Sequence, residues 1–86
     1  MKLKEDFISH SVGAESFLVP TGNASWVGVV RGNKTFDAIV ALLRTETTEE
    51  AVVAAMRKRF DAPDGVIEQD VAHAVAELRK IGALDE

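Results

Sequence analysis

The spacing of hydrophobic and polar positions changes once along the chain, near Asn33. Before this point, apolar residues mostly alternate with polar ones, which is the pattern of strands that bury one face. After it, apolar residues recur at intervals of three and four, which is the pattern of helices buried along one side. The sequence therefore predicts strands followed by helices, within a single domain that spans residues 1–86.

The first part of the chain is expected to form short strands joined by tight turns. The expected strands cover residues 8–12, 17–19 and 25–30. Glycine and asparagine within residues 13–15 and 21–23 can take the backbone angles that such turns need, and Pro20 closes the second strand. The third segment is rich in valine and contains Trp26, which makes it the best strand candidate. Consecutive strands with tight connections predict an antiparallel meander.

The second part is expected to form three helices, each with an apolar stripe along one side. Asn33 can cap the first helix. Thr47 with Glu50 fits a capping box at the start of the second, although Thr48 could be the cap instead. The second helix is expected to end near Phe60. The expected stripes are Phe36, Ile39, Val40 and Leu43, then Val52, Ala55, Met56 and Phe60, then Ile67, Val71, Ala74, Leu78 and Ile81.

The third helix is expected to include Pro63 in its first turn and to stop at Gly82. Arg79 and Lys80 lie in its last turn, where the helix dipole favours positive charge. Strands followed by helices predict an α+β fold, in which a three-stranded antiparallel sheet packs on three helices. The short break between the second and third helices gives this fold a winged helix-turn-helix character.

Length and composition limit the class of protein. The chain has 86 residues, and its 47% apolar residues are enough to fill one small core without cross-links. It has no cysteine, which excludes disulfides, thiol nucleophiles and cysteine-ligated clusters and suits a reducing cytoplasm. The start of the sequence lacks the apolar segment of a signal peptide, and no apolar run is long enough to span a membrane. A cytoplasmic protein without a membrane partner is therefore expected.

The net charge of −4 argues against a general affinity for nucleic acid, which needs a clustered basic face. A winged-helix DNA-binding protein is the main alternative from another class, but its recognition helix would carry basic or amide side chains toward the bases. The third helix here offers Glu68, Asp70 and Glu77 instead, so nucleic acid is not expected as a partner. The basic run Arg57-Lys58-Arg59 is either a solvated face or a docking point for an acidic partner.

No motif with the spacing of a catalytic or metal site is found in the sequence. The segment from Gly28 to Thr35 follows an expected strand and precedes a helix, but it lacks the spacing of a phosphate loop. His10 and His73 are too few and too far apart for a recognisable metal site and are expected to face solvent. The serines have no accompanying base. We therefore expect neither enzymatic activity nor a cofactor.

The order of elements and several short motifs resemble the PqqD family, whose members recognise ribosomally made peptides that are later modified. The motifs are the strand-to-helix segment 29–35, the helix end Leu42-Leu43, the helix start Thr48-Glu49-Glu50, the pair Asp70-Val71, and Leu78 before Gly82-Ala83-Leu84. The resemblance covers roughly residues 12 to 85. The chain departs from the family pattern at Gly32, where a leucine is usual, and at Phe36, where a small residue is usual.

The resemblance implies a non-catalytic chaperone. Such proteins bind the leader part of a precursor peptide as an added strand beside the third strand, in a cleft shared with the third helix. They present it to a modifying enzyme, often a radical SAM enzyme, and pyrroloquinoline quinone (PQQ) biosynthesis is one pathway that uses them. A structural subunit of a larger enzyme assembly is a further alternative.

The expected sheet edges support this interpretation, because proteins usually block exposed edges with lysine, proline or charge. Lys2 and Lys4 precede the first strand, and Pro20 ends the second, whereas residues 25–30 contain no such residue before Arg31. The third strand is therefore expected to accept a peptide, unless it is buried or paired in a homodimer. Gly28 would leave room for a second backbone. The expected contact residues are Trp26, Val27, Gly28, Val29, Val30, Arg31, Val71, Ala74, Val75 and Leu78.

Overall fold

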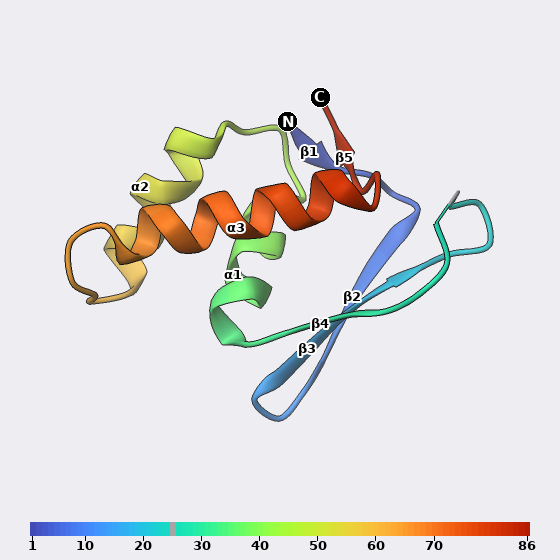
Figure 1. The fold of residues 1–86 in the computed structure, drawn as a ribbon, viewed down its shortest axis with the longest axis horizontal. Helices are drawn as coiled ribbons and strands as arrows, with labels where there is room; N and C mark the ends of the chain where they lie inside the picture. The colour runs from blue at the N-terminus through green and yellow to red at the C-terminus, as the bar shows by residue number, and fades with distance from the viewer. Residues whose placement is uncertain (25) are drawn as a thin grey trace.

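The computed structural model describes residues 1–24 and 26–86 and consists of strands followed by helices, with a short terminal strand (Figure 1). The strands are β1 (Lys2–Leu3), β2 (Phe7–Val12), β3 (Glu15–Pro20), β4 (Val30–Gly32) and β5 (Leu84–Asp85). The helices are α1 (Lys34–Leu42), α2 (Glu49–Arg59) and α3 (Val66–Lys80). A three-stranded antiparallel sheet followed by three helices confirms the predicted α+β fold.

The central sheet has the order β2-β3-β4, so consecutive strands are neighbours and the predicted meander is confirmed. In the β2–β3 hairpin, Phe7 pairs with Pro20 at one end and Val12 with Glu15 at the other. The turn at the hairpin tip uses Gly13, whose φ of 60° is readily adopted by glycine. β4 pairs with β3 on one side only, which leaves β4 at one edge of the sheet and β2 at the other.

β4 begins later than the sequence suggested. The expected strand covered residues 25–30, of which Ser25 lies outside the described residues, whereas β4 comprises Val30–Gly32. The physical reason is Trp26, whose ring stacks on that of Phe7 at a centroid distance of 6.4 Å. Because the ring of Trp26 packs against the core, the segment before β4 forms a loop and not a strand.

Gly28 in this loop has a φ of 149°, which side-chain-bearing residues rarely adopt. A Cβ added at Gly28 would lie only 2.7 Å from the ring of Trp26. The space in the Cβ direction of this glycine is therefore filled by the ring of Trp26, and the approach of a peptide backbone to Gly28 stays a prediction.

The starts of the first two helices are set by side-chain caps. Asn33 caps α1 as predicted, since its side-chain oxygen accepts a 3.0 Å hydrogen bond from the backbone N–H of Phe36. At α2 the cap is Thr48, whose hydroxyl oxygen accepts from the N–H of Ala51 at 3.1 Å. The alternative cap is therefore confirmed, and the capping box expected at Thr47 is wrong.

α3 begins at Val66, so the placement of Pro63 in its first turn is also wrong. Gly65 precedes the helix in a left-handed conformation with a φ of 85°, and this turn separates the proline from the helix. At the other end, Gly82 has a φ of 73° and follows the helix directly after Ile81, which confirms the predicted stop.

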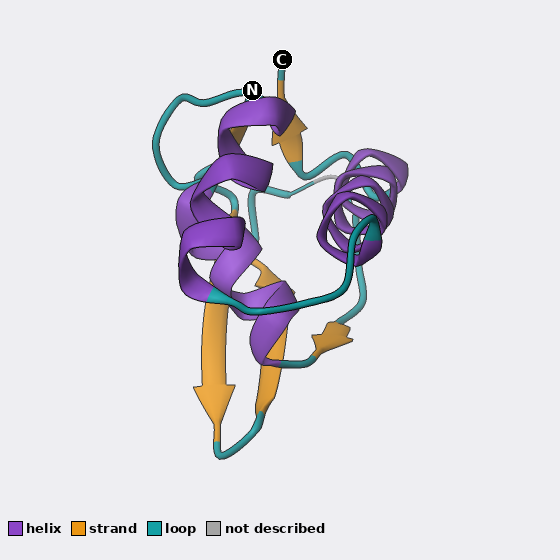
Figure 2. Ribbon diagram, turned by 90° about the vertical axis from the view of Figure 1, so that its left-hand side faces the viewer, coloured by secondary structure: helices purple, strands orange, loops and turns teal. Residues whose placement is uncertain are grey.

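The helices lie on one face of the sheet (Figure 2). Along β3, Ser16 and Leu18 are buried beneath the helices, while Phe17 and Val19 alternate with them and lie on the other face. That uncovered face includes Ile8, which is 54% exposed. The core is formed mainly by Leu18, Ile39, Val40, Leu43, Val52, Met56, Val71, Val75 and Leu78. None of the described helices combines the length and the apolar character that crossing a membrane requires.

A second, two-stranded sheet brings the N- and C-terminal segments together (Figure 1). β1 pairs with β5, which places Leu3 opposite Leu84, and both side chains are buried. The backbone N–H of Leu3 also donates to the carbonyl of Leu43 at 2.8 Å. The sequence did not reveal this pair, because strands of two residues have no periodicity to detect.

Candidate functional site

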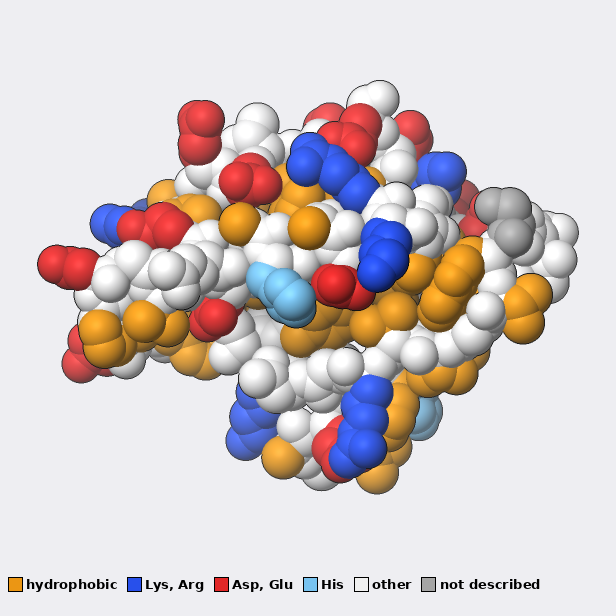
Figure 3. All heavy atoms as spheres, viewed as in Figure 1, with side chains coloured by type: hydrophobic (Ala, Val, Ile, Leu, Met, Phe, Trp, Pro, Cys, Tyr) orange, Lys and Arg blue, Asp and Glu red, His pale blue; other side chains and the backbone are white. Residues whose placement is uncertain are grey.

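A cleft of about 610 Å³ lies between the outer edge of β4 and α3. Its lining comes from the hairpin tip, β4, the start of α1 and one side of α3, namely Ala14, Glu15, Val30, Arg31, Gly32, Asn33, Phe36, His73, Ala74 and Glu77. Figure 3 shows apolar side chains at the surface in the region of these elements, bordered by charged groups. Segments far apart in the sequence thus meet at a sheet edge.

The outer edge of β4 can accept another strand. Along a strand, the backbone N–H and C=O groups of alternate residues point to opposite sides, so those that do not face β3 point away from the sheet. Within residues 1–24 and 26–86, no strand pairs with that side of β4. These backbone groups are available as hydrogen-bond partners for an extended peptide.

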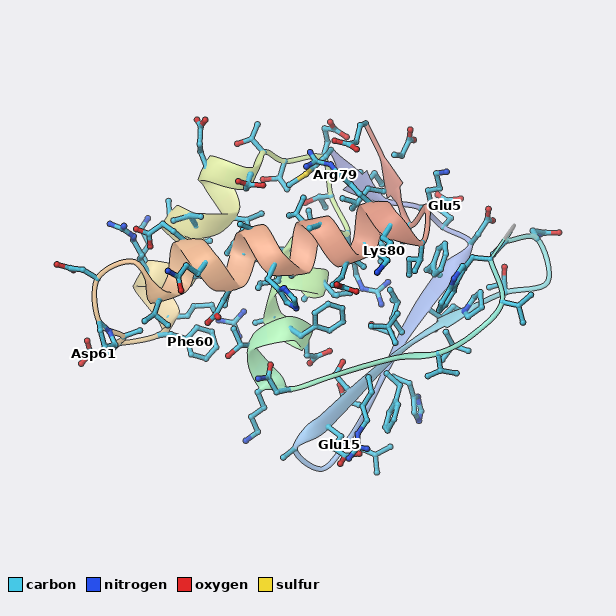
Figure 4. The ribbon with its side chains drawn as sticks, viewed as in Figure 1. Glu5, Glu15, Phe60, Asp61, Arg79 and Lys80 are labelled. Atoms are coloured by element: carbon cyan, nitrogen blue, oxygen red, sulfur yellow. The ribbon has the colours of Figure 1, made fainter. Side chains whose placement is uncertain are left out.

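Arg31, the charged residue of β4, does not block this edge. Its guanidinium donates to the carboxylate of Glu15 at the hairpin tip, which Figure 4 labels. Arg31 lies opposite Phe17 in the β3–β4 register, so Glu15 is its diagonal neighbour on the same face of the sheet. The ion pair therefore holds the guanidinium of Arg31 over β3, away from the outer edge of β4.

α3 forms the second wall of the cleft and divides the helix residues that were expected to contact a peptide. Ala74 lines the cleft with a small side chain, which is only 2% exposed and also packs in the core. Val71, Val75 and Leu78 are all 0% exposed and belong to the core, where they support α3 from behind. Contact of these three side chains with a peptide stays a prediction.

Gly32 and Phe36 form a size-matched pair inside the cleft. A Cβ added at Gly32 would clash with Cδ2 of Phe36 and would lie 2.6 Å from Cγ of the same residue. The ring of Phe36 therefore occupies the space that a side chain on β4 would take. These are the two positions at which the chain departs from the family pattern, so the departures amount to one exchange of a large and a small residue between β4 and α1.

The remaining strand residues that were expected to contact a peptide lie before the cleft. Val30 and Arg31 line the cleft, whereas residues 26–29 form the loop that precedes β4. In this loop Val27 and Val29 are 92% and 59% exposed. A peptide longer than β4 would continue past these valines, and contact with residues 26–29 stays a prediction.

The structure divides the basic run Arg57-Lys58-Arg59 at the end of α2. Arg57 donates to Glu68 of α3, and this hydrogen bond lowers the pKa of Glu68 below its usual range. Arg59 lies 5.8 Å from the ring centroid of Phe60 and lines a separate cleft of about 420 Å³. Arg57 and Arg59 therefore contact different parts of the protein.

His10 and His73 are both exposed, as the sequence suggested. In the described part of the chain, no three metal-ligating side chains lie close enough together to hold an ion. Arg79 donates to both carboxylate oxygens of Glu86, and this pairing lowers the pKa of Glu86 and raises the pKa of Arg79. These groups lie at the C-terminal end of α3.

A model of the family described as coenzyme PQQ synthesis protein D (PqqD) matches residues 19–84, which include β4, the three helices and most of the cleft. The chain belongs to the PqqD family. The resemblance inferred from the sequence motifs is thereby confirmed, and the β4–α3 cleft is a feature of a PqqD protein. Among curated proteins, no match to this chain is found.

A solved structure described as "TbiB1 in Complex with the TbiA(beta) Leader Peptide" has the same fold as this PqqD protein. The two structures align with a TM-score of 0.71 at 18% sequence identity. The alignment covers 99% of this chain and 100% of that chain. At this identity, the likeness shows that the whole chain shares the fold.

Sequence reasoning identified the edge but not all the residues that complete the cleft. Phe36, His73 and Glu77 line it, and none of them was among the expected contact residues. The spacing held a partial signal, because His73 and Glu77 lie one helical turn apart beside the apolar stripe of α3. Which flank of the stripe faces β4 depends on how α3 crosses the sheet, and no local pattern encodes that.

Proposed function

We propose that this PqqD protein is a non-catalytic chaperone that acts as a single peptide-binding domain. It binds the leader part of a ribosomally made precursor peptide as a fourth strand beside β4. The observation that carries the proposal is the unpaired edge of β4, which borders a cleft against α3. Membership of the PqqD family and a fold shared with a protein solved with a leader peptide support it.

The shortness of β4 limits how much backbone pairing contributes to affinity. A three-residue strand offers about three backbone hydrogen bonds to a neighbour, each worth about 0.5–1.5 kcal/mol net. Ordering a flexible peptide costs about 2–5 kcal/mol, which is similar to that total. Side chains seated in the cleft, at about 1.5–3 kcal/mol for each one fully buried, must therefore supply most of the affinity.

We further propose that the bound peptide is presented to a modifying enzyme, with a radical SAM enzyme as the expected type. The uncovered sheet face offers this enzyme an apolar surface, because Ile8, Val12 and Val19 are 54%, 59% and 36% exposed. The same face borders β4, so an enzyme bound there would lie beside the peptide. Sedimentation at increasing concentration distinguishes this arrangement from a homodimer that buries the same face.

The experiment that tests peptide binding needs an unbiased probe. A displayed library of random peptides about 12 residues long suffices, since such a peptide spans roughly 40 Å when extended. A selected peptide should shift the amide resonances of β4 and of the cleft side of α3 in an isotopically labelled sample. Shifts confined to β2, or absent from both β4 and α3, would refute the proposal.

Ala74→Leu and Ala72→Leu provide a matched pair of variants. Both add the same side chain to α3, but Ala74 lines the cleft and is only 2% exposed, whereas Ala72 is exposed elsewhere on the helix. Because leucine at position 74 can also overpack the core, urea unfolding of both variants is measured beside binding. We expect Ala74→Leu to weaken peptide binding about tenfold or more, which corresponds to about 1.4 kcal/mol, because the larger side chain fills the cleft. Ala72→Leu should bind normally. If both variants bind equally well while circular dichroism shows them folded, the peptide does not occupy the cleft.

A further inference from the structure

Glu77 is a half-buried carboxylate on the cleft side of α3. Ion pairs elsewhere on the protein join Arg31 to Glu15, Arg57 to Glu68, and Arg79 to Glu86. In the part of the chain that the structure describes, Glu77 takes part in none of the ion pairs or side-chain hydrogen bonds. The cleft therefore contains a carboxylate that forms no direct ion pair or side-chain hydrogen bond with the described residues.

A peptide strand in the cleft would cover Glu77 on the side that now faces solvent. Removing a carboxylate from water without a partner is costly, so a wholly apolar strand would be penalised. Arg31 is already paired with Glu15 and does not compensate the charge. Lys80 extends from the last turn of α3 (Figure 4) but is exposed, and no described ion pair joins it to Glu77. A lysine or arginine in the peptide would supply the missing charge through a charge-assisted hydrogen bond.

The directions of β4 and α3 determine where Glu77 lies relative to the apolar part of the cleft. The two elements run in opposite directions in Figure 1, and Phe36 lies against Gly32 at the end of β4. Ala74 lines the cleft together with Phe36, and Glu77 follows about 4.5 Å further along the helix axis. Alternate residues of an extended peptide point to the same side and lie about 6.6 Å apart. The spacing along the peptide is thus about 2 Å longer than the spacing along the helix, and the flexible side chains of glutamate and lysine can span this difference.

We infer that the cleft selects peptides that carry an apolar side chain against Phe36 and Ala74 and a lysine or arginine against Glu77, two residues away. This inference rests on the proposed function and adds to it the chemical class of the peptide. It makes Glu77 a specificity-determining residue. The backbone edge of β4 is indifferent to sequence, whereas this carboxylate distinguishes a basic side chain from a neutral or acidic one.

The test is a selection of displayed random peptides on the wild-type protein and on Glu77→Gln, with Glu50→Gln as the control. Glu50 is exposed on α2, away from the cleft, so its change removes the same charge without touching the site. Wild-type protein and Glu50→Gln should enrich peptides with a basic residue two positions from an apolar one. Glu77→Gln should lose the basic preference and keep the apolar one, and Glu77→Lys should favour an acidic residue at that position.

Affinities of one selected peptide give a second measurement. Replacing its basic residue by norleucine should weaken binding to the wild-type protein about tenfold and binding to Glu77→Gln less than about twofold. A selection that enriches peptides for the cleft without any basic preference would overturn this inference alone. An equal loss of affinity for the wild-type protein and for Glu77→Gln would also overturn this inference. A selection that enriches no peptide would overturn the proposed function, and this inference with it.

Discussion

The contact between Gly32 and Phe36 leads to a stability prediction that can be worked out from atomic distances. The methyl group of Gly32→Ala would lie 2.6 Å from Cγ and 2.7 Å from Cβ of Phe36. Carbon atoms pack well at about 3.5–4.0 Å, so β4 and α1 must separate locally by roughly 1 Å. Because the clash includes Cβ of Phe36, rotation of the ring alone does not relieve it.

We expect Gly32→Ala to lower the free energy of unfolding by about 1–3 kcal/mol, the usual cost of overpacking. Phe36→Ala should cost about 1.5–3 kcal/mol, less than a fully buried phenylalanine, because its ring is half exposed. In the Phe36→Ala background the new methyl group no longer meets the ring, but it still lies 2.7 Å from the Cβ that alanine retains at position 36, so part of the clash persists. Gly32→Ala should therefore remain destabilising in that background but cost less, with a coupling energy of about 0.5–2 kcal/mol.

Urea unfolding of the four proteins, followed by far-ultraviolet circular dichroism, measures this coupling. A typical domain of 86 residues has a free energy of unfolding of about 4–13 kcal/mol, so the single variants should remain folded. Fluorescence of Trp26 gives an independent signal, because this ring packs on Phe7. If Gly32→Ala costs the same in both backgrounds within about 0.5 kcal/mol, the ring does not occupy the space beside β4.

The remaining predictions concern stability outside the cleft. Thr48→Ala should lower the free energy of unfolding by about 1 kcal/mol through loss of the α2 cap, while Thr47→Ala should have little effect; equal effects in urea unfolding would contradict this assignment. Ser16→Ala should lower the free energy of unfolding by about 1 kcal/mol, because it removes the buried hydroxyl that donates to Oδ1 of Asp37 at 3.0 Å; an unchanged melting curve would contradict this. Arg57 lowers the pKa of Glu68 in the folded state. The Arg57–Glu68 pair therefore stabilises the fold fully at a pH above the ordinary pKa of glutamate, and this stabilisation is lost as the pH falls through the lowered pKa. Glu68→Gln should therefore show a smaller loss of stability on acidification, and identical pH profiles would be inconsistent with the ion pair.

Several elements could be predicted from the sequence because their signals are local. The strand pattern around the hairpin and the Asn33 cap depend on residues that are neighbours along the chain, and both were confirmed. The errors arose where tertiary contacts outweighed local preference. Residues 26–29 have a strong strand composition, but packing Trp26 against Phe7 turns them into a loop.

The candidate site shows the same division. An unprotected edge was predicted from the absence of lysine, proline and charge in residues 25–30. The structure places β4 at the edge of the sheet, but β4 shares only Val30 with that segment and contains Arg31. The helix residues were taken from the centre of the apolar stripe, where Val71 and Leu78 prove to be fully buried. The flank of the stripe, with His73 and Glu77, forms the cleft instead. Residues of the buried stripe and residues of the cleft wall lie about one position apart on the helix, and hydrophobic periodicity cannot separate positions that close.

By itself, the sequence determined the types and order of the three helices and of the strands in the central sheet, because alternation, helical spacing and capping are properties of residues close together in the chain. Only the tertiary structure decided that β4 faces α3 across a cleft, and that the ring of Phe36 fills the space above Gly32. It also decided that Glu77 has no ionic partner within the described residues. Each of these features depends on the relative placement of separate elements, which is set by packing and not by any one segment.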